Sequence, residues 1–264
     1  MPSVELSVPK VSLIVPVYQP GEWWQQCLHS IRSQDYGDVE LLIEYDDERT
    51  GPAAARNRGL DKATGEFVMF VDADDFLEPG AITKMVEAID GVDWVAASFR
   101  KFGDFEAVVQ HEDAILDLRQ VATYAMGNLK NPRSSQLLSG CWAKLYRRNL
   151  YLRFPELKTA EDMALNFDYL RRCKRVRFIP DIVYHNRKRN GSLTTTFSLT
   201  EPTGLFGFLE GLKYVKRFLS GFYSDGELED AIDHSKVYHS ILYYMRICAS
   251  TGEPMNDVFK KLYP

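Results

Sequence analysis

The sequence has no apolar run near the roughly 20 residues that a membrane-spanning helix needs. Its first ten residues, MPSVELSVPK, lack the basic-then-apolar pattern of a secretory signal. These two absences lead us to expect a cytoplasmic protein. The 264 residues, 45% hydrophobic and 26% charged, are typical of a soluble globular protein that can bury a core.

Cysteine and histidine are also scarce. The sequence has four cysteines and five histidines, and no two cysteines stand at a metal-ligand or redox spacing. A zinc site is therefore not expected, and the thiols are most simply reduced. The four cysteines are Cys27, Cys141, Cys173 and Cys248.

Basic residues are few in the first half of the chain. Residues 1–129 contain 10 Lys and Arg against 23 Asp and Glu, a net charge of −13. Residues 130–190 contain 15 against 5, a net charge of +10, and residues 191–264 have a net charge of −2. The basic middle segment indicates an anionic ligand or surface. Its cationic side chains could instead simply solvate helices.

Strand and helix patterns alternate over the first hundred residues. Apolar runs predict strands at Val11–Val17, Val39–Tyr45, 66–73 and 92–99, and helical spacing predicts helices over 23–34, 52–65 and 79–89. This alternation predicts an α/β fold with a mostly parallel sheet and helices on both faces. Beyond residue 100 we expect a helix over 161–173, short strands at 175–180 and 181–189, and helices from Gly204 onward.

Aspartates follow two of the predicted strands. Asp72, Asp74 and Asp75 end the stretch FVMFVDADD, and Asp46 and Asp47 end VELLIEYDD. Parallel sheets bind ligands at the carboxyl ends of their strands. Like charges this close raise each other's pKa unless a cation compensates them. Mg²⁺ is typically held by one or two carboxylates plus substrate phosphates, so the pattern indicates a cation and a diphosphate. An acidic loop that only solvates a strand end would show the same spacing.

Six segments carry a resemblance to a known family. They occur in the family's order over residues 10–195: VSLIVPVYQPGEWWQQCLHSIRSQ, VELLIEYDD, AARNRGLDKATGEFVMFVDADD, CWAKLYRRNL, FPELKTAEDMALNF and IVYHNRKRNGSLT. The sequence resembles the inverting family 2 glycosyltransferases of GT-A fold that act in bacterial polysaccharide and lipo-oligosaccharide biosynthesis. It departs from their pattern at Gln19, where the family has Asn, and in the short loop ERTGP.

The resemblance implies a three-part organisation and an activity. Residues 1–100 would form the nucleotide-sugar half of a GT-A domain, 101–195 its acceptor half and 196–264 a helical extension. The enzyme would move a hexosyl or N-acetylhexosaminyl group from a nucleotide donor, by the family's habit a UDP-sugar, to a saccharide or lipid-linked saccharide hydroxyl. The cofactor would be Mn²⁺ or Mg²⁺. The basic segment could contact the inner membrane face, and the C-terminal helices could pack on the catalytic domain or form a homodimer.

The resemblance also implies roles for residues on the donor side. Asp47 would accept the ring N–H of the base, with Asp46 beside it. The other residues implied to contact the nucleotide are Pro16, Val17, Tyr18, Arg56, Asn57 and Asp72. Arg187, with Ser192 nearby, would neutralise the diphosphate.

The implied metal ligand is Asp74, with Asp72 and Asp75 assisting. His185 is either a third ligand or a structural histidine.

On the acceptor side, the resemblance assigns the general base to Asp162 and a supporting contact to Glu161. Inverting transfer needs one carboxylate that takes the proton of the attacking hydroxyl. The alternative interpretation is a helix cap, in which Thr159 and Asp162 form a capping-box-like pair. Trp142 and Lys144 match positions near the acceptor, although Trp142 could equally be a core residue.

Two other function classes share some of these features. A nucleotide-sugar pyrophosphorylase or other nucleotidyltransferase would also have carboxylates and a metal at the strand ends. Such enzymes usually carry a Gly-rich, basic loop after the first strand, and this chain has PVYQPGEWW there. A non-catalytic binding module would have no use for Asp162 together with the metal carboxylates.

Overall fold

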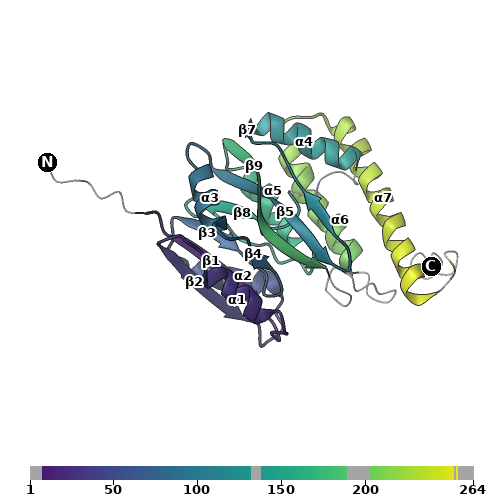
Figure 1. The fold of residues 1–264 in the computed structure, drawn as a ribbon. Coiled ribbons are helices and arrows are strands. Elements are labelled where there is room, and N and C mark those ends of the chain that lie inside the picture. The colour runs from purple at the N-terminus through teal and green to yellow at the C-terminus, as the bar shows by residue number, and fades with distance from the viewer. Residues whose placement is uncertain (1–7, 132–137, 189–202, 253, 255–264) are drawn as a thin grey trace.

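A nine-stranded mixed sheet forms the centre of the protein (Figure 1). The structure is a computed structural model and describes residues 8–131, 138–188, 203–252 and 254. The main path of the sheet runs β2-β1-β3-β8-β5-β9-β4, with β6 paired to β5 and β7 to β9. The strands are β1 (Val11–Val17), β2 (Val39–Tyr45), β3 (Phe67–Phe70), β4 (Phe76–Leu77), β5 (Trp94–Gly103), β6 (Ala107–Val109), β7 (Ala114–Asp117), β8 (Lys144–Arg147) and β9 (Arg175–Lys188).

The strands β1, β2, β3, β5 and β9 run in one direction. β1 is parallel to β2 and β3, β5 is parallel to β9, and β8 lies antiparallel between β3 and β5. The expected α/β fold with a mostly parallel sheet is confirmed in these strands. The sequence analysis did not predict β8, because four residues are too few to show a hydrophobic period. The two strands expected at 175–180 and 181–189 form the single strand β9.

Seven helices occur in the described part of the chain. They are α1 (Trp24–Arg32), α2 (Pro52–Lys62), α3 (Ala81–Ala88), α4 (Leu118–Lys130), α5 (Glu161–Leu170), α6 (Thr203–Leu219) and α7 (Asp225–Thr251). α2 ends at Lys62, three residues before the Gly65 expected to end it. Gly65 instead allows close backbone approach, since a Cβ there would lie 2.6 Å from the Ser12 amide nitrogen. None of the helices in the described ranges is long and apolar enough to cross a membrane.

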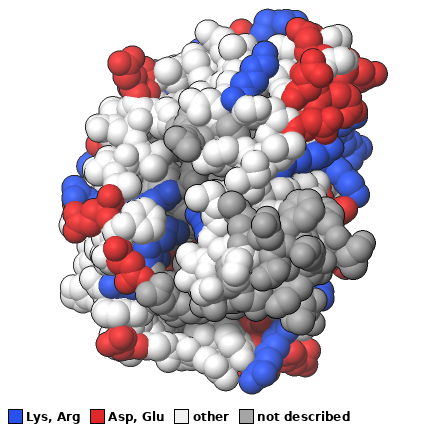
Figure 2. Space-filling model, turned by 90° about the vertical axis from the view of Figure 1, so that its right-hand side faces the viewer, with Lys and Arg blue, Asp and Glu red and all other residues white. Residues whose placement is uncertain are grey.

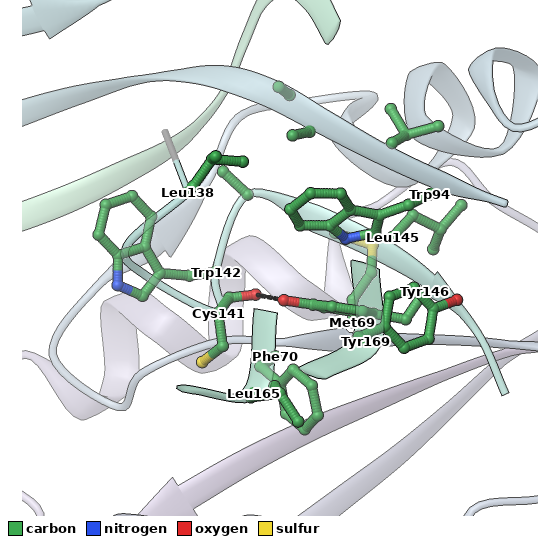
Figure 3. Packing of buried hydrophobic residues seen from close by; sticks show 14 of the residues in the cluster. Met69, Phe70, Trp94, Leu138, Cys141, Trp142, Leu145, Tyr146, Leu165 and Tyr169 are labelled. Carbon is green, nitrogen blue, oxygen red and sulfur yellow. Dashed lines mark hydrogen bonds between the residues drawn. The ribbon is translucent and has the colours of Figure 1, made fainter. Parts of the chain in front are cut away.

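The core is built on the buried strands and includes part of the C-terminal region. β1 and β3 are almost wholly buried, and Trp94 of β5 packs near the rings of Tyr146 and Tyr169 (Figure 3). α6 contributes Leu212, Val215, Phe218 and Leu219 to this same core. The C-terminal helices therefore pack on the domain that contains the sheet, as one of the two interpretations expected.

The strand register brings the acidic segments to one edge of the sheet. Val17 of β1 is opposite Tyr45 of β2, and Ile14 of β1 is opposite Phe70 of β3. Because these strands are parallel, the loops that follow them leave the sheet at the same edge. Those loops contain Asp46 and Asp47 after β2 and residues 72–75 after β3.

Candidate active site

A buried arginine joins the two halves of the candidate site. The Arg56 side chain of α2 is only 4% exposed and forms ion pairs with three carboxylates. It donates to Asp72 at 2.7 Å, to Asp162 at 3.0 Å and to Glu161 at 3.1 Å. Asp72 follows β3, whereas Glu161 and Asp162 begin α5. One cation thus brings together the carboxylates that the sequence assigned to the donor side and to the acceptor side.

Glu161 and Asp162 occupy the first turn of α5, where the helix dipole favours negative charge. The residue at the N-cap is Ala160, not Thr159, and the Ala160 side chain makes no capping hydrogen bond. The alternative interpretation of Thr159 and Asp162 as a capping box is therefore wrong. The Asp162 carboxylate instead forms an ion pair with Arg56, and 19% of the Asp162 side-chain surface remains exposed. That exposure leaves the carboxylate reachable by a ligand.

The two acidic residues of α5 differ in environment. Burial raises the pKa of Glu161 to about 7, with a further contribution from the nearby charge of Asp162. Burial raises the pKa of the Cys141 thiol well above its ordinary value; the charge of Arg56 opposes this shift, and the charges of Asp162 and Asp72 add to it. The backbone oxygen of Cys141 accepts a hydrogen bond from the Tyr146 hydroxyl (Figure 3). Cys141 is thus a buried, neutral thiol that senses the charge of Asp162, and an isolated cysteine shows no spacing signal in the sequence.

The loop after β3 is anchored to β9 by Asp75. Its carboxylate is buried and accepts hydrogen bonds from the Tyr184 hydroxyl at 2.8 Å, the Asn186 amide group at 2.9 Å and the Arg187 backbone at 2.6 Å. Burial, together with the charges of Asp72 and Asp74, raises the pKa of Asp75 well above its ordinary value. Asp75 therefore faces β9 in this structure and does not present its carboxylate to a metal.

Asp74 and Asp72 are the two partly exposed carboxylates of this loop. The described residues contain no group of three or more His, Cys, Asp or Glu side chains that could hold a metal ion. An ion at this loop would therefore take most of its ligands from elsewhere. The two carboxylates of Asp72 and Asp74 fit Mg²⁺ or Mn²⁺, which is typically bound through one or two carboxylates and substrate phosphates.

His185 is a structural residue in this arrangement. Its ring stacks on Phe76, with centroids 4.3 Å apart, and its Nε2 atom contacts Glu78. The interpretation of His185 as a third metal ligand is therefore corrected in favour of the structural one.

Arg187 lies against aromatic rings, beside the loop after β3 that contains Asp74. Its guanidinium lies 3.7 Å from the centre of the Trp23 ring and 4.4 Å from that of Phe102. It donates to the backbone oxygen of Asp74 at 3.0 Å and to Gln26 at 2.6 Å. Arg187 thus holds the loop in place, and its role toward a diphosphate stays a prediction. Ser192, expected nearby, lies outside the described residues.

Lys188 is a cation at this site that the sequence analysis did not single out. The charges of Asp75, Asp72 and Asp74 favour its charged form, although burial lowers its pKa overall. The signal in the sequence was the run Arg187–Lys188–Arg189, from which only the first member was chosen.

The aspartates after β2 have separate environments. Asp46 is buried, and its carboxylate accepts hydrogen bonds from the Thr50 backbone at 2.8 Å, the Thr50 hydroxyl at 2.6 Å and the Gly51 backbone at 2.8 Å. It therefore shapes the loop, while Asp47 is exposed. Tyr18 is exposed at the neighbouring end of β1, Pro16 is half-buried and Val17 is buried.

Asn57 does not face the nucleotide side. Its side-chain amide donates to the backbone oxygen of Phe154 at 3.0 Å and accepts from the Phe154 backbone nitrogen at 2.9 Å. Asn57 therefore anchors the segment before α5, and its contact with ribose or diphosphate stays a prediction.

The two residues expected near the acceptor are core residues. The Trp142 ring stacks on Tyr184 with centroids 5.2 Å apart, and Phe99 packs against it edge-on. Lys144 is 1% exposed and donates to the backbone oxygen of Trp142, and burial lowers its pKa to about 8. Neither side chain can contact an acceptor from the surface, so these two assignments are corrected.

The basic residues of the middle segment are dispersed and partly neutralised. Arg147 donates to backbone oxygens of Ile89 and Val92, Arg172 pairs with Asp168, and Arg177 pairs with Asp113. Blue and red side chains are also interspersed on the face drawn in Figure 2, the side of the molecule on which α6 and α7 lie in Figure 1. The net charge of the segment therefore overstates the positive charge available to an anionic surface.

Comparisons with known proteins agree with this geometry. Residues 43–152 match the family described as Glycosyl transferase family 2. The chain is 28% identical over 229 residues to the glycosyltransferase EpsH of Bacillus subtilis, covering 73% of this chain and 64% of EpsH. It is 31% identical over 106 residues to the GalNAc(5)-diNAcBac-PP-undecaprenol beta-1,3-glucosyltransferase of Campylobacter jejuni, covering 30% of this chain and 34% of that protein. The match therefore spans less than two thirds of either relative.

The fold is similar to that of a solved structure with a bound nucleotide sugar. S. aureus TarS 1-349 in complex with UDP-GlcNAc superimposes with a TM-score of 0.66 at 21% sequence identity, covering 86% of this chain and 71% of that chain. This similarity confirms the expected GT-A fold, including the helices at the C-terminal end. Together with the ordered motifs, the family match over residues 43–152 and the similarity to EpsH support a family 2 glycosyltransferase.

Proposed function

We propose that the protein transfers a hexosyl or N-acetylhexosaminyl group from a UDP-sugar to a hydroxyl of a saccharide or lipid-linked saccharide, with inversion, in one displacement. The observation that supports this most is the Arg56-centred cluster at the carboxyl edge of the sheet. In this cluster Asp162, whose side chain is partly exposed, and Asp72 form ion pairs with the same arginine. A sugar bound between them would have a base on one side and its leaving diphosphate on the other.

Asp162 is the proposed general base. A single displacement needs one carboxylate to take the proton of the acceptor hydroxyl as the new glycosidic bond forms. Arg56 orients this carboxylate. Glu161 shares Arg56 and supports the geometry.

Donor binding is proposed at the loops after β1, β2 and β3. The exposed side chains of Tyr18 and Asp47 would contact the base, and Asp72 the ribose. Asp74 would hold Mn²⁺ or Mg²⁺ together with the diphosphate, and this ion would stabilise the charge on the leaving nucleoside diphosphate. Lys188 would add positive charge on the same side.

The donor and acceptor classes follow from the relatives. TarS was solved with UDP-GlcNAc, which favours a UDP-sugar here. The Campylobacter relative is named for an undecaprenyl diphosphate acceptor, which favours a lipid-linked saccharide and peripheral contact with the inner membrane face. In this proposal residues 1–100 bind the donor, 101–195 bind the acceptor, and a homodimer could form through the remaining helices.

A donor-turnover assay tests the proposal. The protein is incubated with Mn²⁺ and each of several UDP-sugars, and released UDP is measured with and without saccharide acceptors. We expect Asp162→Asn to lower turnover about 10²-fold or more. The matched control is Asp168→Asn on the same helix, which removes only a partly exposed ion pair with Arg171 and Arg172. Equal activity of the two variants would refute the role of Asp162. Pyrophosphate release from UTP and a sugar 1-phosphate, without UDP release, would replace the proposal with a nucleotidyltransferase.

A further inference from the structure

The helix α6 packs against the start of α5, where the proposed catalytic acids lie. Its C-terminal half is anchored in the core by Leu212, Val215 and Phe218, and Phe218 packs near the ring of Phe167 on α5. Its N-terminal half carries glycines at the points of contact. α6 therefore lies on the catalytic domain (Figure 1), next to the segment that presents Glu161 and Asp162.

Gly207 allows the closest of these contacts. A Cβ atom at this position would lie 2.7 Å from the carbonyl oxygen of Thr159 and 2.9 Å from its Cβ, and nearer still to its hydroxyl oxygen. Real Cβ atoms essentially never approach other atoms within 3.0 Å, and a backbone oxygen cannot rotate away as a flexible side chain can. An alanine here would therefore push α6 and the Thr159 backbone apart.

Gly211, one turn further along, makes a second and softer contact. A Cβ atom there would lie 2.5 Å from Met163 Cε and 3.2 Å from Ala160 Cβ. Met163 Cε is the end of a flexible side chain and can move, whereas Ala160 Cβ is fixed to the backbone. The strain at Gly211 is therefore smaller than at Gly207.

The backbone under these glycines is unusual. Ala160 has a φ of 61°, in the left-handed region, which is strained for a residue with a Cβ. Such a conformation persists only when the surrounding structure enforces it. Thr159 and Ala160 on one side, and Met163 on the other, bracket Glu161 and Asp162. The residues that α6 touches are thus the ones that set where α5 begins.

We propose that Gly207 and Gly211 are positioning residues: through them, α6 holds the left-handed turn at Ala160 and so places Asp162 on Arg56. This inference rests on the proposed function for its catalytic meaning. A displacement of about 1 Å at a reacting group can cost about 10²-fold in rate. The C-terminal extension is accordingly part of the catalytic unit.

Three alanine variants in one helix test the inference: Gly207→Ala, Gly211→Ala and the matched control Gly204→Ala. At Gly204 the nearest atom to a new Cβ is a Tyr243 ring carbon at 3.5 Å, an ordinary contact. All three changes replace a glycine in α6 by a better helix former, and the contact with α5 is what distinguishes Gly207 and Gly211 from Gly204. The readouts are kcat and donor KM for UDP release, and amide hydrogen exchange over residues 160–166.

We expect Gly207→Ala to lower kcat about 10–100-fold with donor KM changed less than about twofold. Gly211→Ala should lower kcat less, and Met163→Ala in that background should restore it. Exchange over residues 160–166 should be at least about tenfold faster in Gly207→Ala than in Gly204→Ala. Should Gly207→Ala fail to fold, Gly211→Ala and its rescue decide the question.

Matching kinetics and exchange in Gly207→Ala and Gly204→Ala would overturn the inference, as would loss in Gly211→Ala without rescue by Met163→Ala. The exchange measurement needs no substrate. If the wild-type protein turns over no nucleotide sugar, the proposed function fails, whereas the exchange comparison still tests the positioning role.

Discussion

Arg56 on α2 donates to Asp162 on α5 at 3.0 Å, although the two residues are 106 positions apart in the chain. The same guanidinium also binds Asp72, so three carboxylates, Glu161 included, share one buried cation. The positive charge of Arg56 compensates these carboxylates, and this allows an acidic cluster to be buried at the edge of the sheet.

Replacement of Arg56 should therefore be costly. Arg56→Met leaves three carboxylates without their buried partner, and we expect a loss of about 3–5 kcal/mol in the free energy of unfolding. Arg56→Lys keeps the charge but loses the fork that reaches Asp72 and Asp162 together, so it should fold better yet lose transferase activity. Urea denaturation and UDP release measure the two effects. Full activity in Arg56→Lys would contradict the bridging role.

The pKa of Glu161 makes stability depend on pH. Because its pKa is about 7 in the folded protein and about 4.5 for an ordinary glutamate, the folded state binds more protons between these values. Stability should therefore fall as pH rises from about 4.5 to 7. We expect Glu161→Gln to gain on the order of 2–3 kcal/mol relative to wild type between pH 5 and pH 8. Urea denaturation at both pH values measures this. Glu210→Gln, in an exposed pair with Lys213, is the control and should show no such gain.

Metal dependence should map to Asp74. We expect EDTA to abolish donor turnover and Mn²⁺ to restore it. Asp74→Asn should raise the Mn²⁺ concentration for half-maximal rate about tenfold or more, because the ion loses a charged ligand. Asp90→Asn, an exposed aspartate after α3, is the control. An unchanged Mn²⁺ requirement in Asp74→Asn would place the ion elsewhere.

Two glycines should respond oppositely to alanine. A Cβ at Gly65 would lie 2.6 Å from the Ser12 nitrogen and 2.8 Å from the Lys10 oxygen, so Gly65→Ala must displace β1. We expect a loss of about 1–3 kcal/mol. Gly127 lies in α4 with nothing within 4 Å of a new Cβ, and Gly127→Ala should gain about 1 kcal/mol. Thermal denaturation of both variants measures the contrast. If Gly127→Ala is less stable than wild type, helix propensity does not determine the stability change at that position.

The elements with strong local patterns were predicted well from the sequence. β1 and β2 have the predicted bounds, Val11–Val17 and Val39–Tyr45, because seven-residue apolar runs bounded by turn residues are informative by themselves. β8 was not predicted, because a strand of four residues depends on its neighbours β3 and β5 for its identity. The placement of Asp46 and Asp75 inside hydrogen-bonded pockets could not be predicted either, since their donors come from turns and from a strand 112 residues away.

The sequence by itself determined that carboxylates follow the second and third strands and that an acidic pair opens a later helix. These facts are local, because periodicity and turn chemistry depend on neighbouring residues. Only the tertiary structure decided which side chains face a ligand. It buried Lys144 and Trp142, turned Asp75 toward β9, and joined Asp72 to Asp162 through Arg56. The physical reason is that burial and charge pairing depend on the order of strands in the sheet, which brings distant segments together.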